Sequence, residues 1–147
     1  MNTTKDARGF TLIEIMVVVV IIGILIGLVA PNVLGRIDKA RVTAAQADIA
    51  TLDQALEMYR LDNRSYPTTD QGLEALVVKP GGEPEPKNWN AEGYLKKKQL
   101  PLDPWSNSYQ YVAPGQEGRA YDLYSFGADG REGGEGYDAD VGNWSRE

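Results

Sequence analysis

The sequence predicts an α+β protein in which one long N-terminal helix carries a small antiparallel sheet near the C-terminus. Three observations lead to this fold class. The stretch from Ile15 to Gly35 holds 21 residues without a charge, apolar residues then recur at helical spacing, and two β-prone runs flank a Pro/Gly-rich segment. A chain of 147 residues has the length of one domain, but its apolar content is concentrated near the N-terminus.

The uncharged stretch predicts a membrane-spanning helix, placed at residues 10–35. About 20 apolar residues suffice to cross roughly 30 Å of hydrocarbon as a helix. A buried core helix is the alternative, whereas a cleaved secretory signal is disfavoured because Leu28 occupies a site that wants a small residue. Basic residues lie on both sides of the stretch, so charge alone predicts no orientation.

The helix is expected to continue beyond the membrane as an amphipathic stem at residues 36–62. Apolar residues alternate at spacings of three and four and would form one stripe facing a core: Val42, Ala45, Ile49, Leu52, Leu56 and Tyr59. Together with the membrane half, this predicts a single helix from about Phe10 to Leu61, and the residues from Asn63 to Pro67 prevent it from continuing.

The residues after the stem predict a short helix and then an ordered loop, together residues 63–107. Thr68 and Gln71 have the spacing of a capping box for a helix from Thr69 to about Val78, which Pro80 and two glycines would stop. The loop that follows carries Trp89, Tyr94 and Trp105. Large rings favour an ordered segment, because disordered linkers contain few of them.

Residues 108–147 are expected to form antiparallel strands and a C-terminal loop. Residues 109–112 and 120–126 are β-prone and flank the sequence Pro-Gly-Gln-Glu-Gly, which predicts a hairpin.

Composition excludes several functions. The chain has no His and no Cys, so it has no Cys/His zinc site, thiol nucleophile, His general base or disulfide. No motif brings together groups for another mechanism, and we predict that the protein is not an enzyme. Its net charge is −6 and its main basic run is only Lys96 to Lys98, which argues against a nucleic-acid partner.

An acidic, glycine-rich stretch near the C-terminus has the composition of a calcium loop. Residues 127–140 contain five acidic side chains and five glycines. Calcium takes six to eight oxygen ligands, and glycines allow the turns that bring carbonyl oxygens together. The EF-hand pattern fails because Arg131 replaces an acidic residue, and a solvated acidic loop without metal is the alternative.

Glu14 is a single carboxylate at the start of the uncharged stretch. A charge in or near hydrocarbon costs about 2.5 kcal/mol or more unless it is paired or reaches the interface. Residues 9–14, Gly-Phe-Thr-Leu-Ile-Glu, follow a short charged leader and precede a long apolar helix. This arrangement resembles the class III signal of type IV pilins and type II secretion pseudopilins.

The resemblance implies specific processing and assembly. A prepilin peptidase would remove the leader, residues 1–9, by cutting between Gly9 and Phe10, and would methylate the new N-terminus at Phe10. Glu14 would pair with the terminal amine of a neighbouring subunit during assembly. The N-terminus would then lie in the cytoplasm.

The similarity extends through the rest of the chain. Four stretches resemble the major pseudopilins of type II secretion, the general secretion pathway protein G family: Tyr66 to Leu76, Asp103 to Trp105, Asp122 to Ser125 and Gly142 to Trp144. Family members hold one structural calcium in the C-terminal loop. The corresponding ligands here would be the side chains of Asp129, Asp138 and Asp140 and the backbone oxygens of Phe126 and Arg131.

The resemblance predicts a filament subunit with a type IV pilin-like fold. It would be a single-pass inner-membrane protein with a periplasmic head, residues 36–147, that polymerises into the periplasmic pseudopilus and drives folded proteins across the outer membrane. Its partners would be further copies of itself, minor pseudopilins, the prepilin peptidase and the inner-membrane assembly platform. A type IV pilin of a surface filament and a membrane-tethered calcium-binding module are the alternatives.

Overall fold

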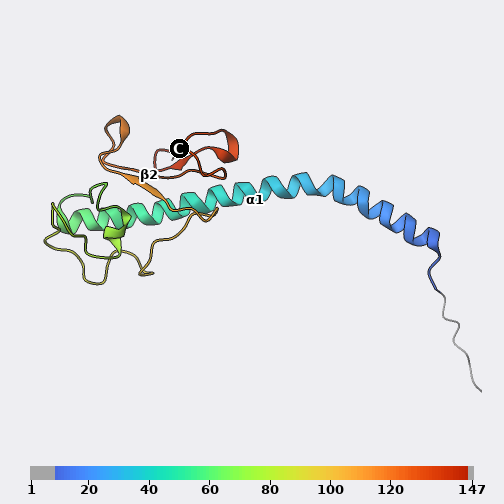
Figure 1. Cartoon of the computed structure of the whole chain (residues 1–147), viewed down its shortest axis with the longest axis horizontal. Coiled ribbons are helices and arrows are strands. Elements are labelled where there is room, and N and C mark those ends of the chain that lie inside the picture. The colour runs from blue at the N-terminus through green and yellow to red at the C-terminus, as the bar shows by residue number, and fades with distance from the viewer. Residues whose placement is uncertain (1–8, 146–147) are drawn as a thin grey trace, which may run out of the picture. The chain divides into compact units, whose positions relative to one another are not determined.

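The computed structural model describes residues 9–145, with the side chains of residues 28–34 outside that description. The chain divides into two compact units, the first ending at Ile37 and the second beginning at Asp38. Its longest element is helix α1, Leu12–Asn63, which contributes to both units (Figure 1). This helix confirms the prediction of one long helix, with each end two residues later than expected.

The first unit contains the uncharged part of α1. Its described large apolar side chains, at positions from Ile15 to Ile26, are 49% to 62% exposed. Within the described residues, no helix combines the length and the apolar character needed to span a membrane.

The second unit has its core on one face of α1. Of the six predicted stripe residues, five are at most 2% exposed and Val42 is partly buried against them. Apart from Ala55 of α1, the rest of the core comes from residues 64–145, which we call the globular part. Helical spacing therefore identified the face of α1 that the globular part covers.

A three-stranded antiparallel sheet lies along this part of α1 (Figure 1). Its strands are β1, Gln110–Val112, β2, Asp122–Ser125, and β3, Val141–Gly142, in the order β1-β2-β3. Tyr111 pairs with Leu123 across β1 and β2, and both side chains are buried. The predicted hairpin is confirmed, with the short 3-10 helix η2, Gln116–Gly118, in its connection.

The prediction of a short helix from Thr69 to Val78 is wrong. Its capping box does form, since the Thr68 backbone N–H donates to Gln71 Oε1 and the Gln71 N–H donates to Thr68 Oγ1. Gly72 then takes φ 60° and ψ −169°, which breaks the helical path. Only the 3-10 helix η1, Leu73–Leu76, follows.

The segment after η1 is an ordered loop, as the aromatic residues indicated. The Trp89 indole donates to the carbonyl of Ala75 at 2.8 Å, and its ring packs edge-on against Tyr94 with centroids 6.2 Å apart. Tyr94 in turn packs on Tyr59 of α1. The loop is therefore fixed to the core by packed rings and by hydrogen bonds, including one from the Tyr94 N–H to the Leu76 carbonyl at 2.8 Å.

Candidate functional site

The N-terminal candidate site is the start of α1. Gly9 and Phe10 precede the helix, and the Phe10 side chain is 84% exposed. The backbone N–H and hydroxyl of Thr11 donate to Glu14 Oε2 at 2.8 and 3.0 Å, while the Glu14 N–H donates to Thr11 Oγ1 at 3.3 Å. This is a reciprocal capping box.

The capping box places the Glu14 carboxylate at the N-terminus of its own helix. The partial positive charge of the helix N-terminus favours an anion there. The role of Thr11 as the partner of Glu14 was not predicted, although the pattern Thr-x-x-Glu at residues 11–14 indicates a capping box. The rest of the predicted leader, residues 1–8, lies outside the described residues.

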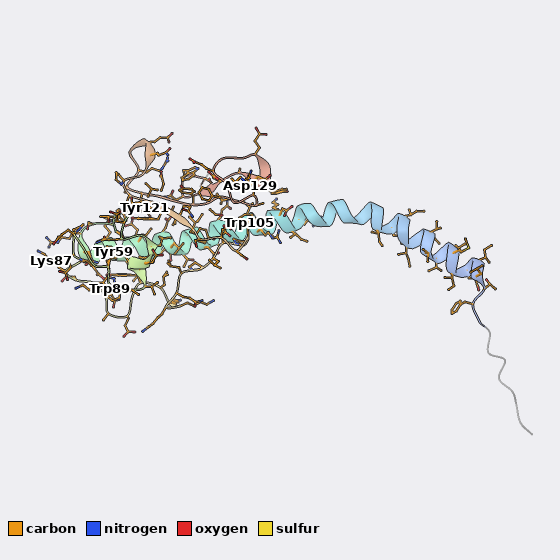
Figure 2. All side chains as sticks on the ribbon, viewed as in Figure 1. Tyr59, Lys87, Trp89, Trp105, Tyr121 and Asp129 are labelled. Carbon is orange, nitrogen blue, oxygen red and sulfur yellow. The ribbon has the colours of Figure 1, made fainter. Side chains whose placement is uncertain are left out.

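The C-terminal candidate site is the loop between β2 and β3. It folds back on itself, because the Ala128 N–H donates to the Tyr137 carbonyl at 3.2 Å. The short 3-10 helix η3, Gly136–Asp138, closes the loop before β3. Figure 2 shows Asp129 on this loop, at the opposite end of the second unit from Lys87.

Asp140 is the most enclosed acidic residue of this loop. Its Oδ2 accepts a hydrogen bond from the Gly133 N–H at 3.0 Å, whereas Oδ1 is buried without a partner in the described structure. A buried carboxylate oxygen without a donor is costly, and a cation beside it would remove that cost.

The other predicted ligands belong to the same loop as Asp140. Asp129 and Asp138 are exposed, and Asp129 Oδ1 accepts from the Arg131 N–H at 3.1 Å. Phe126 directly follows β2 and packs its ring on Tyr124 at 5.4 Å. Within residues 9–145, no three acidic side chains are gathered as a metal site, so the loop offers oxygen donors of the right type without the side-chain cluster.

Glu132 is an acidic neighbour that sequence analysis did not select. Burial raises the pKa of the Tyr124 phenol, and the negative charges of Glu132 and Asp140 raise it further. Both carboxylates therefore act on the same end of the sheet. Sequence analysis missed Glu132 because nothing in its position distinguishes it from the other acids of the loop.

A buried hydrogen-bond network fixes the start of the loop. Asp103 is 4% exposed, and its Oδ1 accepts from the backbone N–H groups of Trp105 and Asn107. Its Oδ2 accepts from the Ser125 hydroxyl, whose oxygen accepts from the Gly127 N–H at 3.2 Å. The loop is thus attached firmly at Gly127, while residues 128–138 are exposed.

Comparison with known families gives two matches that together cover most of the chain. The model described as "Type II secretion system (T2SS), protein G" matches residues 32–144. The model described as "Prokaryotic N-terminal methylation motif" matches residues 4–30.

Individual proteins agree with these matches. The chain is 65% identical over 140 residues to a type II secretion system core protein G of Pseudomonas aeruginosa, covering 95% of this chain and 96% of the relative. It is 56% identical over 145 residues to the protein of the same name from Vibrio cholerae, covering 99% and 97%.

A solved structure shares the fold. The crystal structure of the major pseudopilin from the type 2 secretion system of enterohaemorrhagic Escherichia coli aligns with a TM-score of 0.69 and 46% identity. The alignment covers 79% of this chain and 96% of that one.

A long N-terminal helix that begins within a methylation motif and carries a small antiparallel sheet defines a pilin-like structural subunit and not an enzyme. The chain belongs to the type II secretion system protein G family.

Proposed function

We propose that the chain is the major pseudopilin of a type II secretion system, a subunit that polymerises into the pseudopilus and drives export of folded proteins across the outer membrane. The observation that carries this proposal is the order of the two family matches: a processing motif over residues 4–30, then the protein G region over residues 32–144. The high identity to proteins named core protein G supports the same function.

In this proposal the protein is anchored in the inner membrane with its N-terminus in the cytoplasm and its head, residues 36–147, in the periplasm. Prepilin peptidase cleaves after Gly9 and methylates Phe10. The subunit then meets the assembly platform, minor pseudopilins and further copies of itself. The methylation motif, the uncharged stretch from Ile15 to Gly35 and the family relationship support this order of events.

Glu14 has the assembly role in this proposal. Its carboxylate is held at the first turn of α1 by Thr11, close to the new N-terminus at Phe10. In an apolar environment an unpaired carboxylate is costly, so the Phe10 amine of a neighbouring subunit is a strongly favoured partner. The pairing would bring each entering subunit to a fixed axial position.

The test is intact-mass and N-terminal analysis of wild type and Glu14→Gln from native membranes, followed by filament imaging. We expect both chains to begin at a methylated Phe10, with filaments strongly reduced only for Glu14→Gln. Glu92→Gln, at an exposed acidic residue of the loop after η1, is the matched control. A chain beginning at Met1 in cells with active peptidase would rule out the filament subunit.

A secretion assay in a deletion strain then separates the pseudopilin from a type IV pilin. Wild-type protein should restore export, and Glu14→Gln should not. Surface filaments together with unrestored export would favour the pilin instead.

We further propose that the C-terminal loop binds one structural calcium ion. The side chains of Asp129, Asp138 and Asp140 and the backbone oxygens of Phe126 and Arg131 would hold it. The buried, unpartnered Oδ1 of Asp140 supports the proposal, as do the hard oxygen donors and the glycines that turn the chain. Bound calcium would offset the repulsion among the carboxylates and stabilise the folded loop by mass action.

Thermal melting of the full chain in detergent, with calcium or with excess chelator, tests the calcium site. We expect chelator to lower the melting temperature of wild type and to have little effect on Asp140→Asn. Glu117→Gln, an acidic residue outside the loop, should respond to chelator as wild type does. If chelator did not change the melting temperature of wild type, the loop would be a solvated acidic segment and the calcium proposal would fail.

A further inference from the structure

Four tyrosine hydroxyls of the globular part bind four carboxylates along α1. The paired residues are between 9 and 68 positions apart in the sequence, and the donor–acceptor distances are 3.0 Å for two of the pairs and 3.1 Å for a third. The pairs are Tyr109 with Asp48, Tyr121 with Asp53, Tyr66 with Glu57, and Tyr94 with Asp62.

The four carboxylates lie on both sides of the buried stripe. With about 100° of rotation per residue, Asp48 and Asp62 fall roughly 60° to 100° to one side of the stripe centre. Asp53 and Glu57 fall roughly 80° to 120° to the other side. We call these two pairs the Asp48 side and the Glu57 side of α1.

The tyrosines come from separate segments of the globular part. Tyr66 follows α1, Tyr94 lies in the ordered loop, Tyr109 precedes β1 and Tyr121 precedes β2. The Tyr66 and Tyr121 rings also pack edge-on with centroids 4.8 Å apart. Each side of α1 is therefore bonded to two segments whose mutual positions are set by other contacts.

The tyrosines are hydrogen-bond donors over the physiological pH range. Burial raises the pKa of the Tyr109 and Tyr121 phenols strongly, and the adjacent carboxylates of Asp48 and Asp53 raise it further. Each hydroxyl thus keeps its proton and donates it to a charged acceptor, the stronger kind of hydrogen bond.

The apolar stripe restrains the rotation of the globular part about α1 with less directional character than hydrogen bonds do. Burial of Ile49, Leu52 and Leu56 depends mainly on the area removed from water and has little directional character. Hydrogen bonds weaken when their donor and acceptor lose alignment. Bonds on both sides of the stripe oppose rotation in both directions.

We propose that the tyrosine–carboxylate pairs are positioning contacts that set the rotation of the globular part about α1. The consequence for assembly rests on the proposed function: α1 enters the filament, so this rotation decides which surface of the globular part meets the next subunit. Sequence periodicity could not reveal the pairs, because donor and acceptor are up to 68 residues apart.

The test compares two double variants that each lose two hydroxyls and keep every ring. Tyr66→Phe/Tyr121→Phe removes both bonds on the Glu57 side. Tyr109→Phe/Tyr121→Phe removes one bond on each side. Spin labels at Gln46→Cys on α1 and Gln116→Cys in the hairpin, both exposed positions in a chain without natural cysteine, report the rotation as a distance distribution.

We expect similar falls in melting temperature for the two variants and different distance distributions. The distribution should shift and widen for the variant that loses the Glu57 side, since one direction of rotation is then unopposed, and should stay near wild type for the other. Filament yield should fall only for the variant whose distance distribution changes, although both variants have lowered melting temperatures. Equal distributions in both variants would overturn the proposal.

The measurement is made on unassembled full-length protein in detergent, so it stands apart from the filament function. If wild type forms no filaments, the proposed function fails while the distances still decide whether the pairs set the rotation. If wild type forms filaments and the two variants are indistinguishable in distance and yield, only the positioning role fails.

Discussion

The stem of α1 and the C-terminal loop are held in place by different physical effects. Along the stem, Ala45, Ile49, Leu52 and Leu56 are at most 1% exposed, and tyrosines bind on both sides of them. In the loop, residues 128–138 are all exposed, and the contacts include backbone hydrogen bonds and bonds from backbone N–H groups to carboxylates.

The stem and the loop belong to one small unit, yet they are stabilised in different ways. Burial of apolar side chains gives the stem cooperative stability that depends little on solution conditions. A loop with few buried contacts opens locally at lower cost and depends on turn geometry and ions. Perturbations aimed at one region should therefore leave the other largely unchanged.

The largest effect should come from the stem. Leu56→Ala removes a fully buried side chain and should lower the free energy of unfolding by about 3 kcal/mol, through lost burial and the cavity left behind. Leu61→Ala, on the same helix at 72% exposure, should change it by less than about 0.5 kcal/mol. Urea denaturation of full-length protein measures both.

If Leu56→Ala and Leu61→Ala were equally destabilising, burial of apolar side chains would not be what stabilises the stem. The distinction between stem and loop would also be weakened if added calcium restored the stability of Leu56→Ala to that of wild type, since a cation bound in the loop should not fill a cavity beside α1.

The sequence predicted the stem well because its information is local. Apolar residues three and four positions apart identify the buried face of a helix wherever the rest of the chain lies. A second local rule, the spacing of a capping box, found the Thr68–Gln71 pair, but it could not show that Gly72 would end the helix at once. Strand β3, Val141–Gly142, is too short to show alternation and was not predicted.

The contacts that complete the second unit depend on the tertiary fold. No spacing rule connects Tyr121 to Asp53 or Asp103 to Ser125, because their meeting depends on how the chain returns to α1. In the loop, residue types predicted the chemistry of a calcium site. The arrangement of the carboxylates depends on the positive φ angles at glycines such as Gly133 and Gly134, which composition alone does not fix.

Substitution of Asp122, a carboxylate of the packed sheet, should have an intermediate effect on stability. Burial raises its pKa, but hydrogen bonds from Arg119 and from the Gln116 N–H outweigh burial, so the net pKa is lowered. A lowered folded-state pKa gives stability above the unfolded value, about 3.9, that is lost as pH falls through the folded value. Acid should therefore weaken the packed sheet through this residue.

Asp122→Asn should cost about 1 to 2 kcal/mol at neutral pH and should flatten the loss of stability below about pH 4. Melting temperatures across a pH series measure both effects. Glu117→Gln, which removes only the exposed ion pair of the same Arg119, should change stability by less than about 1 kcal/mol. If the melting temperature of Asp122→Asn fell with acid as steeply as that of wild type, other carboxylates would be responsible for the acid sensitivity.

The smallest effect on global stability should come from alanine substitutions at two adjacent glycines of the loop. These substitutions should also separate the behaviour of the loop most clearly from that of the stem. Gly133 and Gly134 have φ angles of 91° and 90°, so alanine is strained at either position. A Cβ on Gly134 would lie 2.4 Å from the carbonyl oxygen of Asp138, whereas a Cβ on Gly133 meets no atom within 4 Å. The backbone of Asp138 must therefore move in Gly134→Ala alone.

Hydrogen exchange separates the local cost of this movement from global stability. Gly134→Ala should speed exchange across residues 127–140 by about tenfold or more relative to Gly133→Ala, equivalent to roughly 1.4 kcal/mol of local opening. Peptides from residues 45–59 should exchange as in wild type in both variants, because the stem is held by burial. Faster exchange in the stem of Gly134→Ala would mean that the loop and the stem open as one cooperative unit.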